Sequence, residues 1–332
     1  MLHPLRASRS RRSFLAACAA LAVSALVPGG MAAQPPETLT VLFIGNSFTG
    51  RHTLSAVVKA MAEAGNPGLK LEVTTLLYGG RTLKDHWRLG TQNFVNHTTL
   101  KPAEVEATLA ALKESVARDP ADSYAKQAIT RQQELLGRLG APRRKWDIVV
   151  LQSYRDDTQG AASSYLEYAP RFAALVKAQG GRTVLYETTP DTQHATALVA
   201  APDRAPVLAK AKLIAALAAR LDAATVPMSL VALHCQTRRP DLTLRFVNDA
   251  HLNQTMAYLT ACAFQAALFG RSPEGLALDT VTDTRYLDAA HRDKDRDNQP
   301  IKRIFSARDR ADLQRAAWEG HQEFLRLVAA AK

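Results

Sequence analysis

Residues 38–45 read T-L-T-V-L-F-I-G, an uninterrupted apolar run that is followed at once by N-S-F-T-G. Such a run, rich in β-branched residues, predicts a buried strand. Similar runs recur at residues 69–77, 147–152, 183–188 and 227–233. Patterns that predict helices lie between or after them, at about 53–65, 162–179, 204–223, 253–269 and 307–330. Apolar strands that alternate with helices are typical of a parallel sheet covered on both faces. We therefore predict an α/β protein with three layers and five strands.

This fold predicts where the chemistry lies. The carboxyl ends of parallel strands meet at one edge of the sheet, and ligands bind there. The positions to search for functional side chains are therefore those that follow Ile44, Leu77, Leu151 and Glu187.

The charge balance argues against a nucleic-acid arm. The 332 residues carry 42 Lys and Arg against 31 Asp and Glu, a formal net charge of +11. Four of the arginines lie in the first 33 residues, which contain no acid, so the remainder carries +7. That remainder is spread along the chain without a long basic run, which predicts a basic surface and no nucleic-acid partner.

The amino terminus has the three parts of an export signal. S-R-R-S-F-L at 10–15 is followed by an apolar stretch from Leu15 to Val27 and by P-G-G-M-A-A. The paired arginines resemble a twin-arginine signal, and the apolar stretch is shorter than the roughly 20 residues that span a membrane. We predict that residues 1–33 are removed during twin-arginine export. A single domain, 34–332, then lies in the periplasm or outside the cell without a stable membrane anchor.

Four predicted loops carry the groups that ester hydrolysis requires. Ser47 stands between the first strand and a helix, and Gly79 and Gly80 follow the second strand. Gln152 ends the third strand, and His251 precedes a late helix. A hydroxyl nucleophile, an imidazole base and N–H donors for an oxyanion form the set needed for acyl transfer. Their convergence on one predicted sheet edge favours catalysis more than any single motif does.

These blocks resemble the SGNH (GDSL-like) hydrolase family in order and spacing over about residues 39–270. The matching blocks are I-G-N-S-F at 44–48, G-G-R-T at 79–82 and N-D-A-H-L-N at 248–253. The resemblance implies a flavodoxin-like α/β/α fold with Ser47 as nucleophile, His251 as base and Gly80 in the oxyanion hole beside the Ser47 N–H. Within the family, G-G-x-x-L-x-x-H-W and V-V-L-Q-S look like the branch of sialate and other carbohydrate O-acetylesterases. The polar section at about 100–140 looks like a helical insertion, and a further helix ends the chain.

The sequence departs from the family pattern at two positions. Where the family has an asparagine that donates to the oxyanion, this chain has Gln152, whose amide is an equivalent donor. Where the family has an aspartate three residues before the histidine, this chain has Asn248, and Asp249 stands two residues before it. We predict that Asp249 orients His251, with Asn248 as the alternative.

We expect the substrate pocket to include four further residues, Asn46, His86, Trp87 and Tyr154. We expect no cofactor or catalytic metal, because the histidines lack paired spacing and no dinucleotide fingerprint is present. The acidic loop D-K-D-R-D-N at 293–298 lacks the glycine and the glutamate of a calcium-binding EF-hand. Cys235 and Cys262 could pair after export, but the apolar surroundings of Cys262 suit a buried free thiol equally well.

The sequence therefore predicts an exported serine esterase that acts on acyl esters, with O-acetyl groups on carbohydrates as the substrate class implied by the resemblance. Two alternatives remain open. A non-catalytic carbohydrate- or envelope-binding protein would keep the fold without a working triad, which the asparagine at position 248 leaves possible. A lipid or aryl esterase would use the same chemistry on another ester.

Overall fold

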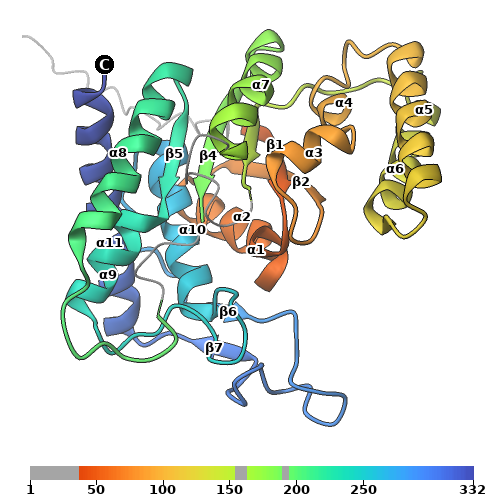
Figure 1. The fold of residues 1–332 in the computed structure, drawn as a ribbon. Helices are drawn as coiled ribbons and strands as arrows, with labels where there is room; N and C mark the ends of the chain where they lie inside the picture. Colours follow the sequence, from red (N-terminus) through yellow and green to blue (C-terminus); the bar gives the residue numbers. More distant parts are fainter. Residues whose placement is uncertain (1–36, 154–162, 189–193) are drawn as a thin grey trace, which may run out of the picture. The chain divides into compact units, whose positions relative to one another are not determined.

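A computed structural model describes residues 37–153, 163–188 and 194–332 of the chain. Its centre is a sheet of five parallel strands in the order β2-β1-β3-β4-β5 (Figure 1). The strands are β1 Glu37–Gly45, β2 Leu69–Leu77, β3 Ile148–Leu151, β4 Arg182–Glu187 and β5 Ala224–Pro227. This is the flavodoxin-like strand order, so the predicted parallel sheet is confirmed. The predicted export signal, residues 1–33, lies outside the described residues.

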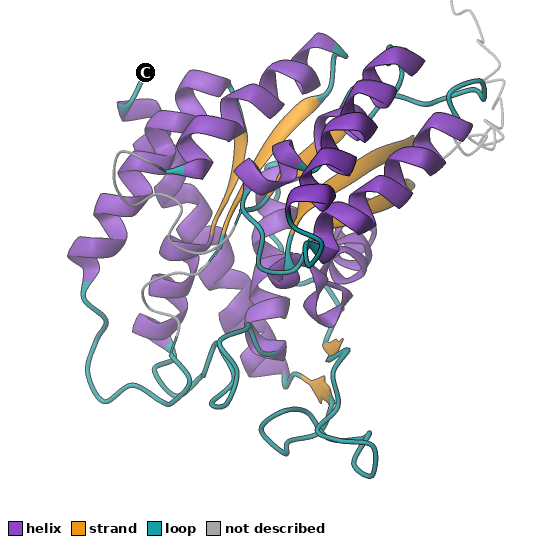
Figure 2. Ribbon diagram, turned by 45° about the vertical axis from the view of Figure 1, so that its right-hand side comes forward, coloured by secondary structure: helices purple, strands orange, loops and turns teal. Residues whose placement is uncertain are grey.

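Helices cover both faces of the sheet (Figure 2). Alternate residues of β1 point to opposite faces: Val41 and Phe43 pack on one side, Leu42 and Ile44 on the other. The first side is covered mainly by α2 Leu54–Gly65 and α10 Gln254–Phe269. The second is covered by α3 Leu83–Arg88, α7 Ser164–Ala178 and α8 Arg204–Leu221. The result is the three-layer α/β/α arrangement that the sequence predicts.

The last predicted strand is wrong in its extent. Residues 227–233 were expected to form a strand, but β5 ends at Pro227 and Met228–Arg238 form helix α9. Leu230 and Leu233 pack with one core cluster, and Val231 packs with the other. A helix surrounded by apolar neighbours shows the same continuous apolar pattern as a buried strand, so periodicity does not separate the two.

The remaining elements lie around the sheet. The polar section forms α5 Pro102–Arg118 and α6 Ser123–Gly137, two helices that pack against each other. Short helices α1 Ser47–Gly50, η1 Arg51–Thr53 and α4 Thr91–Val95 follow strand ends or turns. The small ribbon of β6 Thr280–Thr282 and β7 Lys302–Ile304 has no counterpart in the prediction, because each strand has only three residues. The last helix, α11 Ala307–Ala330, packs on α9 and α10. In the described part of the chain, no helix has the length and apolarity that crossing a membrane requires.

Candidate active site

Ser47 stands in a tight turn at the carboxyl end of β1. Asn46 caps the helix that begins with Ser47, because its side-chain oxygen accepts a hydrogen bond from the Phe48 N–H (3.0 Å). The Asn46 amide nitrogen donates to the Arg81 carbonyl (3.1 Å), which ties this turn to the glycine turn after β2. Asn46 is fully buried, whereas Ser47 is half-buried. Asn46 therefore holds the turn that carries Ser47, and its buried side chain does not line a substrate pocket as predicted.

Ser47, His251 and Asp249 form a continuous chain of contacts. The Nε2 atom of His251 lies 2.7 Å from the Ser47 Oγ, and its Nδ1 contacts Oδ1 of Asp249. The same Asp249 oxygen accepts a hydrogen bond from the His251 backbone N–H (3.1 Å). The His251 side chain is 22% exposed and that of Asp249 11% exposed, so the hydroxyl and imidazole can be reached while the carboxylate is shielded. This is the geometry in which an imidazole can take the proton of a nucleophilic serine.

The two candidates for the residue that orients the histidine lie in different places. Asp249 reaches the imidazole from the position two residues before it. Asn248 is exposed, and its backbone N–H donates to Asp297 (3.3 Å), as does the N–H of Val247 (2.8 Å). Asp297 thus holds the outer part of the loop at residues 246–252, which we call the histidine loop, and this loop turns Asp249 inward.

Asp249 remains ionised well into the acidic range. Burial opposes its ionisation, but the hydrogen bonds from His251 and a guanidinium hydrogen bond from Arg51 lower the pKa of Asp249 to about 2. Arg51 donates from Nη1 to the second carboxylate oxygen at 2.8 Å. A carboxylate that stays negative can stabilise an imidazolium across the pH range in which most hydrolases act.

The glycine turn after β2 offers a backbone donor. Gly80 has φ +65°, a left-handed conformation that favours glycine, and the space that a Cβ would fill is open. Within the described ranges, neither the Gly80 N–H nor the Ser47 N–H has a hydrogen-bond partner. The Tyr124 hydroxyl on α6 donates to the Gly79 carbonyl at 2.7 Å and so fixes this turn. The two N–H groups are therefore available to an oxyanion.

Gln152 was predicted to donate its amide to the oxyanion, but its side chain points into the core. It is fully buried, and its side-chain oxygen accepts hydrogen bonds from the Asn46 N–H (2.8 Å) and the Thr49 hydroxyl (3.0 Å). Its amide nitrogen donates to the Ser153 carbonyl. A Cβ at Gly45 would lie 2.4 Å from the same Gln152 oxygen, which explains the glycine there. Gln152 therefore stabilises the turn that carries Ser47, because the buried N–H of Asn46 needs an acceptor.

His86 and Trp87 are structural residues and do not line a substrate pocket as expected. The fully buried His86 bonds the Gly45 carbonyl (2.9 Å) and the Thr91 hydroxyl (3.0 Å), and burial lowers its pKa to about 4. Trp87 packs edge-on against Phe172 of α7, with ring centroids 5.1 Å apart. The fourth predicted pocket residue, Tyr154, lies outside the described residues.

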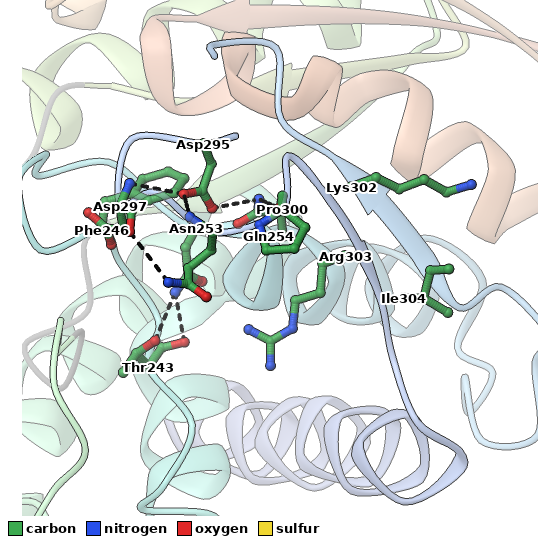
Figure 3. Close-up of a pocket in the computed structure, with 11 residues that line it drawn as sticks. Thr243, Phe246, Asn253, Gln254, Asp295, Asp297, Pro300, Lys302, Arg303 and Ile304 are labelled. Atoms are coloured by element: carbon green, nitrogen blue, oxygen red, sulfur yellow. Dashed lines mark hydrogen bonds between the residues drawn. The ribbon is translucent and has the colours of Figure 1, made fainter. Parts of the chain in front are cut away.

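A polar pocket of about 400 Å³ lies beside the histidine loop (Figure 3). Asn253 donates from its side chain to the Thr243 hydroxyl (3.1 Å), and Gln254 donates to Asp295 (3.0 Å). Asp295 also accepts from the N–H groups of Asp297 and Gln299 (2.9 Å each). The acidic loop at 293–298 therefore uses the Asp295 carboxylate to organise its own backbone and to hold Gln254 at the start of α10.

The described ranges hold no group of three or more His, Cys, Asp and Glu side chains placed to bind a metal ion. Cys235 and Cys262 are buried free thiols. Burial raises the pKa of Cys235 to about 12, which leaves it a poor nucleophile at neutral pH.

Two charged residues of the site were not predicted. Arg51 contacts Asp249 and Asp283 contacts Arg51, although Arg51 is far from both aspartates in the sequence. No local motif marks them, since Asp283 precedes a charged surface loop and Arg51 follows a short turn. The short separation between Ser47 and Arg51 is the one signal that could have drawn attention to the arginine.

Comparisons with known proteins are sparse. No family model and no curated protein matches this chain. Among solved structures, a DUF4886 family protein from Bacteroides uniformis is similar at 16% identity, with a TM-score of 0.46 over 85% of this chain and 94% of that one. A protein from Slackia heliotrinireducens, described provisionally as an SGNH hydrolase, is similar at 16% identity, with a TM-score of 0.40 over 70% of this chain and all of that one.

Proposed function

We propose that this protein is an exported serine esterase of the SGNH type that hydrolyses acyl esters. The observation that carries the proposal is the chain of contacts from the half-buried Ser47 through the accessible His251 side chain to the shielded Asp249 carboxylate. The resemblance of the sequence blocks to carbohydrate O-acetylesterases supports O-acetyl groups on carbohydrates as the substrate class.

The reaction follows from the roles of these groups. The Ser47 oxygen attacks the ester carbonyl while His251 takes its proton, and the carbonyl oxygen becomes an oxyanion. The N–H groups of Ser47 and Gly80 donate to that oxyanion. Collapse expels the alcohol, which receives the proton from His251 and leaves an acyl group on Ser47. Water, deprotonated by His251, then releases the acid and restores the serine.

The non-catalytic alternative depends on the asparagine at position 248. The carboxylate that the family has at that position is replaced in space by Asp249, which contacts the imidazole directly. This contact favours an active hydrolase over a binding protein on the same fold.

A fluorophosphonate probe tests the proposal without knowledge of the natural ester. We expect the mature protein to be labelled at Ser47, with the site located by peptide mass spectrometry. Ser47→Ala should not be labelled. Its matched control, Ser55→Ala, should be labelled like the unaltered protein, because Ser55 lies buried in α2 and its loss leaves the contacts of Ser47 in place. A substrate series of acetylated sugars, aryl acetates and longer acyl esters then separates the carbohydrate, aryl and lipid alternatives. Absence of labelling at Ser47 contradicts the proposal.

Export through the twin-arginine route is a second part of the proposal. Arg11→Lys together with Arg12→Lys is expected to leave the precursor in the cytoplasm, because the receptor reads the arginine pair and not its charge. Fractionation and immunoblotting of a host with this machinery measure the result. Arg6→Lys together with Arg9→Lys is the control and should be exported. Normal export of the Arg11 and Arg12 variant would show that the general secretory route suffices.

A further inference from the structure

A buried arginine stands behind the triad. The Arg51 side chain is 2% exposed, and its Nη1 donates to Asp249 Oδ2 at 2.8 Å, while Asp249 Oδ1 serves His251. Both oxygens of the carboxylate therefore have fixed partners on opposite sides.

Asp283 holds the arginine in turn. Its two oxygens accept from Arg51 Nη2 (2.8 Å) and Nε (3.3 Å), a bidentate arrangement that fixes the plane of the guanidinium. The guanidinium carbon lies 5.0 Å from the centre of the Phe246 ring, and the Asp283 side chain is fully buried. A chain of polar contacts thus runs from Ser47 through His251, Asp249 and Arg51 to Asp283.

The backbone beside Arg51 is strained. His52 and Thr53 have φ +59° and +47°. Such left-handed values are rare for residues other than glycine, and they persist where the surrounding structure imposes them. His52 contacts the Leu252 carbonyl through Nε2 (2.9 Å), next to the catalytic histidine. The strained turn thus connects the nucleophile segment to the histidine loop at the point where Arg51 enters.

We propose that Arg51, anchored by Asp283, is a positioning residue of the triad: it fixes the Asp249 carboxylate, and its positive charge lies beside the carboxylate that contacts His251. This inference rests on the proposed esterase function. Among the residues that the structure describes, two further titratable groups lie close to this chain of contacts: His52, whose Nδ1 lies 3.5 Å from Asp283, and Arg296, whose Nε lies 3.9 Å from Asp249.

Three variants separate geometry from charge. Arg51→Gln removes the charge, so we expect kcat on 4-nitrophenyl acetate to fall by about 10- to 100-fold. The acidic limb of the kcat/KM profile should move to higher pH by about half a unit to one unit. Arg51→Lys keeps the charge but not the planar fork, so kcat should fall by about tenfold with the limb unmoved. Asp283→Asn weakens the anchor of the Arg51 guanidinium, so kcat should fall. It also leaves the positive charge of Arg51 less neutralised, so the acidic limb should move to lower pH. KM should change little in all three.

Arg239→Gln is the matched control. Arg239 also pairs with several aspartates, Asp241, Asp309 and Asp312, and its side chain is 11% exposed. We expect this variant to lose thermal stability while kcat and the pH limb remain those of the unaltered protein.

The outcomes are distinct. The inference is supported if the acidic limb of the kcat/KM profile moves in opposite directions in Arg51→Gln and Asp283→Asn. A purely structural role would lower the thermal stability of both variants without moving the limb. Unchanged kcat and unchanged limbs in folded variants overturn it while leaving the esterase function in place. If Arg51→Gln does not fold, Arg51→Lys and Asp283→Asn decide the question through the same two readouts. Failure of the unaltered protein to hydrolyse esters or to react with a fluorophosphonate overturns the proposed function, and this inference with it.

Discussion

Ser47→Ala is expected to abolish hydrolysis of a simple acetyl ester while the fold stays intact. Removing the hydroxyl removes the atom that attacks the carbonyl, and only oxyanion stabilisation and substrate binding remain. Loss of a triad nucleophile in well-studied serine proteases costs several orders of magnitude, so we expect a fall in kcat of about 10⁴-fold or more. Steady-state kinetics on 4-nitrophenyl acetate measure the loss.

The fold should survive because Ser47 is half-buried at a helix start that Asn46 caps. Thermal unfolding of Ser47→Ala should therefore match that of the unaltered protein. Ser55→Ala should keep kcat within about a factor of two and unfold at a similar temperature, since Ser55 lies in the first turn of α2 and alanine is a strong helix former. A Ser47→Ala protein that is folded and fully active would rule out Ser47 as the nucleophile.

Asp249→Asn is expected to lower kcat by at least about 10²-fold, with a smaller change in KM. The neutral amide cannot stabilise an imidazolium as a carboxylate does. Its nitrogen would also face either the imidazole or the donors of Arg51, so one of the two contacts is lost. Kinetics on the same acetyl ester, with circular dichroism as a check on folding, test this expectation.

Asn248→Ala is the control for that assignment and should lower kcat by about tenfold or less. Asn248 is exposed, and its contact with Asp297 is made by the backbone N–H, which alanine keeps. If Asn248→Ala proves more damaging than Asp249→Asn, the position three residues before the histidine orients the base, and the role proposed for Asp249 is wrong.

The apolar pattern predicted most of the sheet because burial on both faces leaves a continuous run of apolar residues. The strands at 38–45 and 69–77 agree with β1 and β2 to within a residue at each end. The run at 227–233 was assigned to the wrong element, since a helix enclosed by the core has the same pattern. The apolar pattern of a segment therefore predicts its burial more reliably than it predicts whether the segment forms a strand or a helix.

Some residues of the candidate site were predicted correctly from the sequence, and others were not. Ser47 and His251 could be placed from sequence because each directly follows or precedes a regular element whose end faces the ligand-binding edge. His86, Trp87 and Gln152 were assigned to the pocket or the oxyanion hole for the same reason, but their side chains turn into the core. The direction of a side chain beyond a strand end depends on which backbone groups nearby lack partners, and those groups come from other segments.

The positions of β1 to β4 and of the loops that carry Ser47, Gly80 and His251 follow from the sequence alone, because continuous apolar runs are local features of the chain and the carboxyl ends of parallel strands meet at one edge. The partners of the Asp249 carboxylate were decided only by the tertiary structure. Arg51 and Asp283 are separated by 232 positions, and their contact exists because the β1 turn and the segment after β6 pack around the same histidine loop. Buried charges require partners at hydrogen-bond distance, and which distant residue supplies one is settled by packing.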